Sequence, residues 1–432
     1  MITKMKHPYA TPVLWTVLFA VALGGCGKQD SETEGQKTEI DTTPVVLRVL
    51  VQQPMSDEDA KALWIEPLAK QYPHITLELI RGKSVESLIA ANETPDLIYT
   101  FNGNLPGYNL NDLLMDMTPL IEKHGIDLSR FEAPVMDSIR VTSKEGSITA
   151  LPFTQQFNAL YYNKSLFDRF GVDYPRDGMY WDETVELAKK LSRSDSGVQY
   201  HGLDIDDVVR VSRPFGVLTV DPVSEKASLD QDNWRKAFDL AREVYTIPNN
   251  FRPKNVGSRP LFLKEQTLAM MGTVNMLAIG LEEAMKNGLD WDLVQYPSYR
   301  ELPNVATIVD AHIFAVTKTS KHKDQAIQAL KVFTSDEVQM LSARKSGRLT
   351  VLRNAEVKQA LGKDMPFLEG KNLEAAFKSK AIAAPAFSRF EGIGVGLTIN
   401  SGMYDYIAGK DINTVIRETE EKINQQIASQ KK

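Results

Sequence analysis

The polar and apolar positions of residues 45–101 follow the spacing of strands and helices in turn. Val45 to Gln52 is rich in β-branched residues, and Ser56 with the carboxylates after it is typical of a helix start. Two more strands are expected at Ile75 to Ile80 and at Asp96 to Phe101, each after a helix. This order predicts an α/β fold with a parallel sheet covered on both faces. Because such sheets bind ligands at the carboxyl ends of their strands, we expect residues 52–55 and 100–104 to share one ligand-binding edge.

Side-chain amides interrupt the apolar pattern after the next strand. Gln155, Gln156 and Asn158 follow Pro152 closely, and a β-type run then begins at Ala159. Amides are costly to bury without partners, so we expect them to face a cleft.

A second apolar strand is predicted at Thr307 to Val316, where Asp310 and His312 are the polar exceptions. A buried carboxylate beside an imidazole needs a partner or a ligand. Residues two apart share one face of a strand, so the two side chains either bond to each other or contact a ligand.

Acidic residues gather at Asp204, Asp206 and Asp207, ahead of Arg213 and Phe215. The glycine and the distal glutamate of a calcium loop are missing, so the pattern favours a solvated helix start and no metal. Arg213 and Phe215 are the candidates for a cleft. Trp181 and Trp234 lie in helical patterns and are expected to pack inside the protein.

Length and charge narrow the class of protein. A chain of 432 residues is too long for one ordinary core and suggests two domains. The formal net charge of −6, without a long basic run, argues against a nucleic-acid surface.

The first residues predict an export signal. Lys4 and Lys6 precede the apolar run Val13 to Leu23, which is short for a membrane span. Leu23-Gly24-Gly25-Cys26 looks like a lipobox, and Cys26 is the only cysteine in the chain, so lipidation of Cys26 is favoured over a plain secretory signal. Residues 1–25 would be the signal peptide and residues 26–44 a flexible polar tether. The expected location is the extracellular face of the cell membrane, in a Gram-positive rather than a Gram-negative bacterium.

Motifs for catalysis and cofactors are absent from the sequence. It has no G-x-S-x-G, no H-E-x-x-H and no phosphate-binding glycine loop, and its six histidines are not at metal-ligand spacing. A glycosidase carboxylate pair leaves no sequence mark, so an enzyme acting on surface polysaccharide stays an alternative. We expect no cofactor and no enzymatic activity.

Several segments resemble the bacterial extracellular solute-binding proteins of ABC importers, in the large family that carries sugars and oligosaccharides. The family pattern of a proline, nine variable residues and Tyr-Asn-Lys is present as Pro152 and Tyr162-Asn163-Lys164. Further matching segments are Ala90 to Ile98, Trp181-Asp182-Glu183, Ser320 to Lys323 and Phe262 to Met276, where Gln266 and Met276 replace the usual glycine and stacking tryptophan.

The resemblance implies a two-lobed periplasmic-binding-protein fold of type II with a ligand cleft between the lobes. The first lobe would comprise residues 45–153 and 308–360, and the second residues 154–307 and 361–432. The implied function is capture of a carbohydrate, in particular an oligosaccharide, by a monomer that delivers it to a membrane permease with its own ATPase. A non-sugar ligand and a sensor-kinase partner are the alternatives.

The predicted ligand-binding residues share polar or aromatic side chains near the expected cleft. They are Gln52, Gln53, Phe101, Asn102, Gln156, Phe157, Asn158, Arg213, Phe215, Asn275, Met276, Asp310, His312, Arg389 and Phe390.

Overall fold

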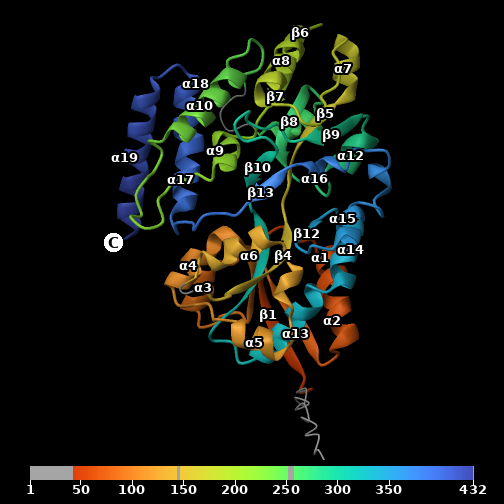
Figure 1. Cartoon of the computed structure of the whole chain (residues 1–432), viewed down its shortest axis with the longest axis vertical. Coiled ribbons are helices and arrows are strands. Elements are labelled where there is room, and N and C mark those ends of the chain that lie inside the picture. Colours follow the sequence, from red (N-terminus) through yellow and green to blue (C-terminus); the bar gives the residue numbers. More distant parts are fainter. Residues whose placement is uncertain (1–41, 144–145, 252–256, 432) are drawn as a thin grey trace, which may run out of the picture. The chain divides into compact units, whose positions relative to one another are not determined.

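Two mixed sheets with separate cores organise the computed structural model, which describes residues 42–143, 146–251 and 257–431. The predicted signal peptide, the lipidation residue Cys26 and the tether up to residue 41 lie outside the described residues. Figure 1 shows the first sheet and its helices below the second sheet, with linking strands between them.

The first sheet has six strands. In spatial order they are β12 (Leu349–Thr350), β4 (Ala150–Gln155), β11 (Ala311–Val316), β3 (Leu97–Phe101), β1 (Val45–Val51) and β2 (Ile75–Ile80). As predicted, β1 pairs in parallel with both β2 and β3, whereas β11 runs antiparallel to its neighbours β3 and β4. The carboxyl ends of β1 and β3 therefore meet at one edge.

Helices cover this sheet on its faces. They are α1 (Asp57–Ala60), α2 (Glu66–Gln71), α3 (Val85–Ala90), α4 (Leu105–Leu110), α5 (Thr118–Lys123), α6 (Ala133–Arg140), α13 (Lys323–Phe333), α14 (Asp336–Ser346) and α15 (Ala355–Gln359). The hydroxyl of Ser56 accepts the Asp59 N–H at 3.0 Å and caps α1, as the sequence predicted. Trp64, which is fully buried, packs edge-on against Tyr99 and Phe314 at ring-centroid distances of 4.9 and 5.0 Å.

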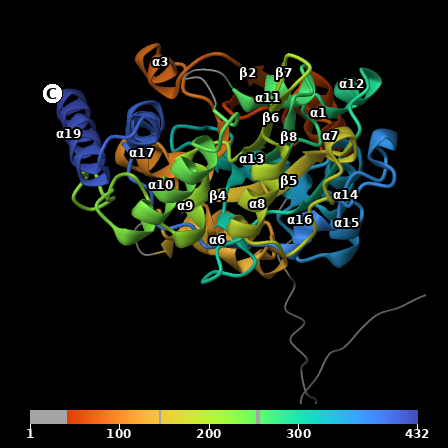
Figure 2. The same cartoon turned by 90° about the horizontal axis from the view of Figure 1, so that it is seen from above.

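The second sheet has five strands, in the order β6 (Arg193–Asp195), β7 (Val198–Asp204), β8 (Leu268–Val274), β5 (Asn158–Asn163) and β9 (Trp291–Gln295). Its helices are α7 (Lys164–Phe170), α8 (Trp181–Leu191), α9 (Val208–Ser212), α10 (Asp232–Tyr245), α11 (Ser258–Leu263), α12 (Leu281–Lys286), α16 (Ala375–Lys378), α17 (Glu391–Leu397), α18 (Tyr404–Ile407) and α19 (Ile412–Gln430). Trp181 and Trp234 are buried in its core, as expected. Seen from above, α17 and α19 of the second sheet lie at one end of the view, and α14 and α15 of the first sheet lie at the other (Figure 2).

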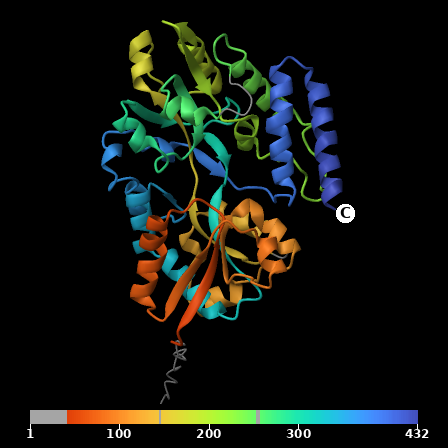
Figure 3. The same ribbon diagram turned by 180° about the vertical axis from the view of Figure 1, so that it is seen from behind.

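Two strand-to-strand segments of the chain join the sheets, and Figure 3 shows both from behind. The first runs from β4 to β5 through Gln156 and Phe157. The second runs from β10 (Val305–Ile308) to β11, so the strand predicted at residues 307–316 is divided at Val309 and Asp310. The cause is a different partner, since β10 leaves the large sheets and pairs in parallel with β13 (Lys380–Ile382). The chain crosses a third time between α15 and α16.

The assignment of residues to two lobes stays a prediction. The strands of the first sheet come from residues 45–155 and 311–350, and those of the second from residues 158–295. In the described ranges, no helix has both the length and the apolar content that crossing a membrane requires.

Candidate ligand-binding site

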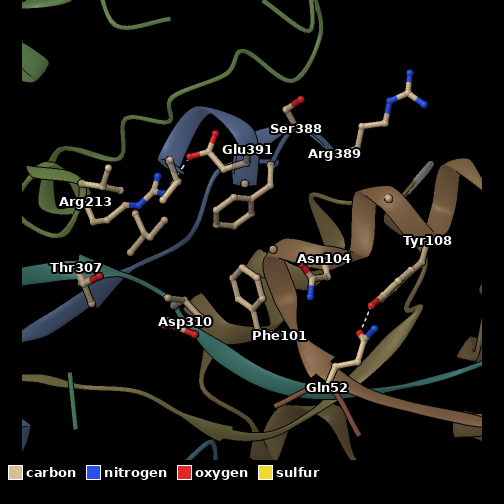
Figure 4. Close-up of a pocket in the computed structure, with 18 of the residues that line it drawn as sticks. Gln52, Phe101, Asn104, Tyr108, Arg213, Thr307, Asp310, Ser388, Arg389 and Glu391 are labelled. Atoms are coloured by element: carbon tan, nitrogen blue, oxygen red, sulfur yellow. Dashed lines mark hydrogen bonds and ion pairs between the residues drawn. The ribbon is translucent and has the colours of Figure 1, made fainter. Parts of the chain in front are cut away.

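A cavity of about 600 Å³ lies where the ends of the first sheet's strands face α9 and α17. We call it the cleft cavity. Its walls come from the end of β1, the β3–α4 segment, residues 307–310 of the second linking segment, the start of α9, and residues 387–395. Figure 4 shows these elements converging, with Phe101 and Asp310 from the first-sheet side below Arg213 and Glu391.

The first-sheet wall of the cleft cavity is held by side-chain hydrogen bonds. The Tyr108 hydroxyl donates to Gln52 Oε1, and Asn104 Nδ2 donates to Thr100 Oγ1 at 2.8 Å. Asn102 is fully buried, and its Oδ1 accepts the Ala311 N–H at 3.0 Å. Asn102 therefore fastens the second linking segment to the end of β3 and leaves the cavity surface to its neighbours.

The opposite wall begins at the acidic cluster that precedes α9. Asp207 caps this helix, since its Oδ1 accepts the Arg210 N–H at 2.7 Å. Asp206 Oδ2 accepts Arg210 Nε at 3.2 Å and the Thr273 hydroxyl at 2.9 Å. The predicted helix start is correct, but the prediction that it is solvated is wrong, because Asp204 is buried and both Asp206 and Asp207 are half-buried by packing against β8. In the part of the chain that the structure describes, no group of three or more acidic, histidine or cysteine side chains could hold a metal ion.

A buried ion pair forms part of the wall opposite the first sheet. Arg213 Nη2 lies 2.9 Å from Glu391 Oε1, with side-chain exposures of only 12% and 9%. Glu391 also accepts the backbone N–H groups of Thr219 and Val220 at 3.1 Å. This carboxylate fixes Arg213, the loop at residues 219–220 and the start of α17 as one rigid wall.

The pKa values of two carboxyl groups in the cavity, Asp310 and Asp207, are raised. Burial raises the pKa of Asp310, an effect that the positive charges of Arg210 and Arg213 partly offset. Burial and the neighbouring Asp206 raise the pKa of Asp207.

The structure divides the predicted ligand-binding residues into three groups. Those that line the cleft cavity are Gln52, Phe101, Arg213, Asp310 and Arg389. Those that line a second cavity, of about 880 Å³, are Gln156, Phe157 and Asn158. Those that line neither cavity are Gln53, Asn102, Phe215, Asn275, Met276, His312 and Phe390.

Packing explains why several aromatic and apolar candidates lie outside both cavities. Phe215 stacks on Tyr299 with ring centroids 4.5 Å apart. Phe390 is buried beneath the guanidinium of Arg389, which lies 4.5 Å from its ring centroid. Met276 is fully buried in an apolar cluster.

One of the two alternatives for Asp310 and His312, a mutual hydrogen bond, is excluded by the partners of the imidazole, and contact of either side chain with a ligand stays a prediction. His312 Nδ1 lies 3.0 Å from the Tyr99 hydroxyl, and Nε2 lies 3.3 Å from Gln156 Nε2. Because both ring nitrogens have other partners, His312 does not pair with Asp310, whose side chain lines the cleft cavity instead.

Several cavity residues were not predicted from the sequence. Asn104 and Tyr108 follow β3, and the expected ligand-binding edge at residues 100–104 could have indicated the first of them. Glu391 and Phe387 come from a segment some 80 residues beyond the second linking segment, and only the fold brings them to the cavity. Other unpredicted lining residues are Glu86, Asp207, Arg210, Thr307 and Ser388.

Linking segments join the two α/β sheets, and a cavity is lined from both sides. This is the arrangement of solute-binding proteins, which close around a ligand. Residues 54–340 match the model of the bacterial extracellular solute-binding protein family. The chain belongs to this family.

Solved structures with the same fold cover most of this chain. An ABC substrate-binding protein from Listeria monocytogenes in complex with cycloalternan is 19% identical over 89% of this chain and 99% of that one, with a TM-score of 0.72. The sugar-binding protein MalE from Xanthomonas citri is 17% identical over 90% and 98%, with a TM-score of 0.70. A sugar transporter protein from Rhizobium etli in an open conformation is 22% identical over 88% and 99%, with a TM-score of 0.69.

Proposed function

We propose that the protein is the carbohydrate-binding component of an ABC importer, which captures one sugar or short oligosaccharide in the cleft cavity and delivers it unaltered to a membrane permease. The observation that carries the proposal is the composition of this cavity. Two aromatic rings, Phe101 and Phe387, lie 6.0 Å apart between centroids, beside polar side chains from both walls. A sugar needs this combination, since its ring has an apolar C–H face and its hydroxyl groups need hydrogen-bond partners.

Capture would proceed by closure of two lobes about the linking segments. A ligand that contacts Gln52 and Phe101 on one side and Arg210 on the other has more contacts when the lobes approach. Its higher affinity for the closed form shifts the population toward that form. Residues 307–310 belong both to the cavity wall and to a linking segment, so ligand contact acts directly at the axis of closure.

Solved structures with this fold support a carbohydrate ligand. The proteins in those structures bind cycloalternan, mannobiose, mannotriose, tagatose, mannitol and maltose. Delivery to a permease, lipidation at Cys26 and attachment to the outer face of the cell membrane complete the proposal, and they rest on the sequence alone.

The proposal is tested by a thermal-shift screen of the full chain against neutral, amino and acidic mono- and oligosaccharides. A ligand present at one hundred times its dissociation constant adds about 2.7 kcal/mol to the free energy of unfolding. For a protein of this size, we expect the melting temperature to rise by several degrees. The recovered sugar should be chemically unchanged after incubation. A screen in which no carbohydrate raises the melting temperature contradicts the proposal.

A further inference from the structure

The arginines of the cleft cavity are already neutralised by carboxylates of the protein. Four acidic and three basic residues line the cavity, and each of the three guanidinium groups lies within 3.2 Å of a carboxylate oxygen. The pairs are Arg210 with Asp206, Arg213 with Glu391 and Arg389 with Glu225. An anionic ligand would have to compete with these carboxylates, so the cavity has no ready site for one.

Some of the other donors that line the cavity are also engaged. The Tyr108 hydroxyl donates to Gln52, and Asn104 Nδ2 donates to Thr100. Arg213 Nη1 donates to the Val217 carbonyl at 3.0 Å. Among the described residues, the groups left for a ligand include donors, such as Gln52 Nε2 and the Ser388 hydroxyl, and acceptors, among them Asn104 Oδ1 and the Asp310 carboxylate.

Asp310 is the strongest of these acceptors. Within residues 42–143, 146–251 and 257–431, its carboxylate forms neither a hydrogen bond nor an ion pair, while it lines the cavity and is half-buried. Charges interact more strongly in such a setting than in bulk water. A carboxylate without a partner in a half-buried cavity is a site for a ligand cation or a strong donor.

An aromatic ring accompanies this carboxylate. Figure 4 shows Phe101 between Asp310 and Asn104 on the same wall. An ammonium group has three donors and no acceptor, and aromatic faces attract it. A carboxylate, an amide oxygen and an aromatic face together match such a group better than they match a neutral hydroxyl, which is both donor and acceptor.

We propose that the cleft cavity selects carbohydrates that carry an amino group, with Asp310 as the counter-ion of the ammonium. This inference rests on the proposed function and narrows its substrate class to amino sugars. Asp310 then determines specificity, because it is the one half-buried acidic group of the cavity that no protein donor satisfies within the described ranges.

The test compares sugars that share the same ring and differ in one charged or neutral substituent. Isothermal titration calorimetry on the full chain would use glucosamine, glucose and glucuronate, then galactosamine, galactose and galacturonate, and then the deacetylated and acetylated disaccharides of glucosamine. Hydrogen bonds to a charged group are stronger than those between neutral groups, so we expect the amino member to bind roughly tenfold tighter or more. The acidic member should bind weakest.

Two variants assign the effect to one carboxylate. Asp310→Asn keeps the shape and removes the charge, and it should abolish the preference for the amino sugar. Glu337→Gln removes an exposed carboxylate that does not line the cavity, and it should keep the preference, because solvent screens that group and the ligand does not contact it.

The outcomes separate this inference from the proposed function. A neutral or acidic sugar that binds as tightly as its amino counterpart overturns the inference and leaves the proposed function standing. A preference for the amino sugar that persists in Asp310→Asn also overturns the inference and leaves the proposed function standing. A screen without any carbohydrate ligand overturns both.

Discussion

His312 shows how the protein keeps a buried titratable side chain neutral. Its imidazole is only 5% exposed and lies between the Tyr99 hydroxyl and the Gln156 amide. Burial, followed by the positive charge of Arg348, lowers the pKa of His312 to about 3. The ring is therefore neutral at physiological pH and acts as a connector between the first sheet and the first linking segment.

This depressed pKa predicts how stability depends on pH. Between about pH 3 and pH 6.5 the unfolded chain binds a proton at this histidine and the folded protein does not, so stability rises with pH across that window. We expect His312→Gln, which retains a donor and an acceptor, to lose less free energy of unfolding between pH 7 and pH 4 than the unmodified protein. Urea denaturation at each pH measures the free energy of unfolding of both proteins. Equal losses in the two proteins would contradict the assignment.

The sequence indicated some site residues and missed others for a physical reason. Gln52, Phe101 and Asp310 lie at strand ends or in a linking segment, where local pattern and strand order place polar groups at an edge. Whether a side chain then points into the cavity depends on packing. Asn102 is adjacent to Phe101 in the sequence, yet it is buried against Ala311.

At the scale of elements, the Arg213–Glu391 pair joins α17 to the segment after α9. Removal of one partner of a buried pair leaves the other charge without compensation. We expect Glu391→Ala to lower the free energy of unfolding by about 3–5 kcal/mol, because Arg213 and two backbone N–H groups lose their acceptor. Chemical denaturation followed by circular dichroism measures the loss.

A surface pair provides the matched control. Lys70 and Glu337 lie 2.8 Å apart, but their side chains are 73% and 72% exposed. Glu337→Ala should change the free energy of unfolding by less than about 1 kcal/mol. Similar losses in Glu337→Ala and Glu391→Ala would show that burial does not distinguish the two pairs.

The elements that the sequence predicted well are those with local signals. The strands β1, β2 and β3 and the capped start of α1 follow from periodicity and capping. The division of residues 307–316 into β10 and β11 could not be predicted, because it depends on β13, some 70 residues away.

At the scale of the whole molecule, family resemblance predicted the fold class, and the family match and the solved structures with this fold bear it out. The cavity could not be predicted to the same extent. Its lining comes from segments that begin near residues 52, 101, 207, 307 and 387, and only the packed structure selects which side chains meet. The second cavity, with Gln156, Phe157 and Asn158, shows that nearness to a linking segment does not suffice to identify the site.

The most direct test of the account is calorimetric titration of the sugar found in the screen into three proteins: the unmodified chain, Phe101→Ala and Gln156→Ala. Phe101 lines the cleft cavity and Gln156 lines the other one. We expect one binding site in the unmodified chain and about tenfold lower affinity in Phe101→Ala, since an aromatic contact contributes roughly 0.5–1.5 kcal/mol beyond its buried area. Gln156→Ala should change the affinity little. Unchanged affinity in Phe101→Ala together with loss in Gln156→Ala would contradict the placement of the ligand in the cleft cavity.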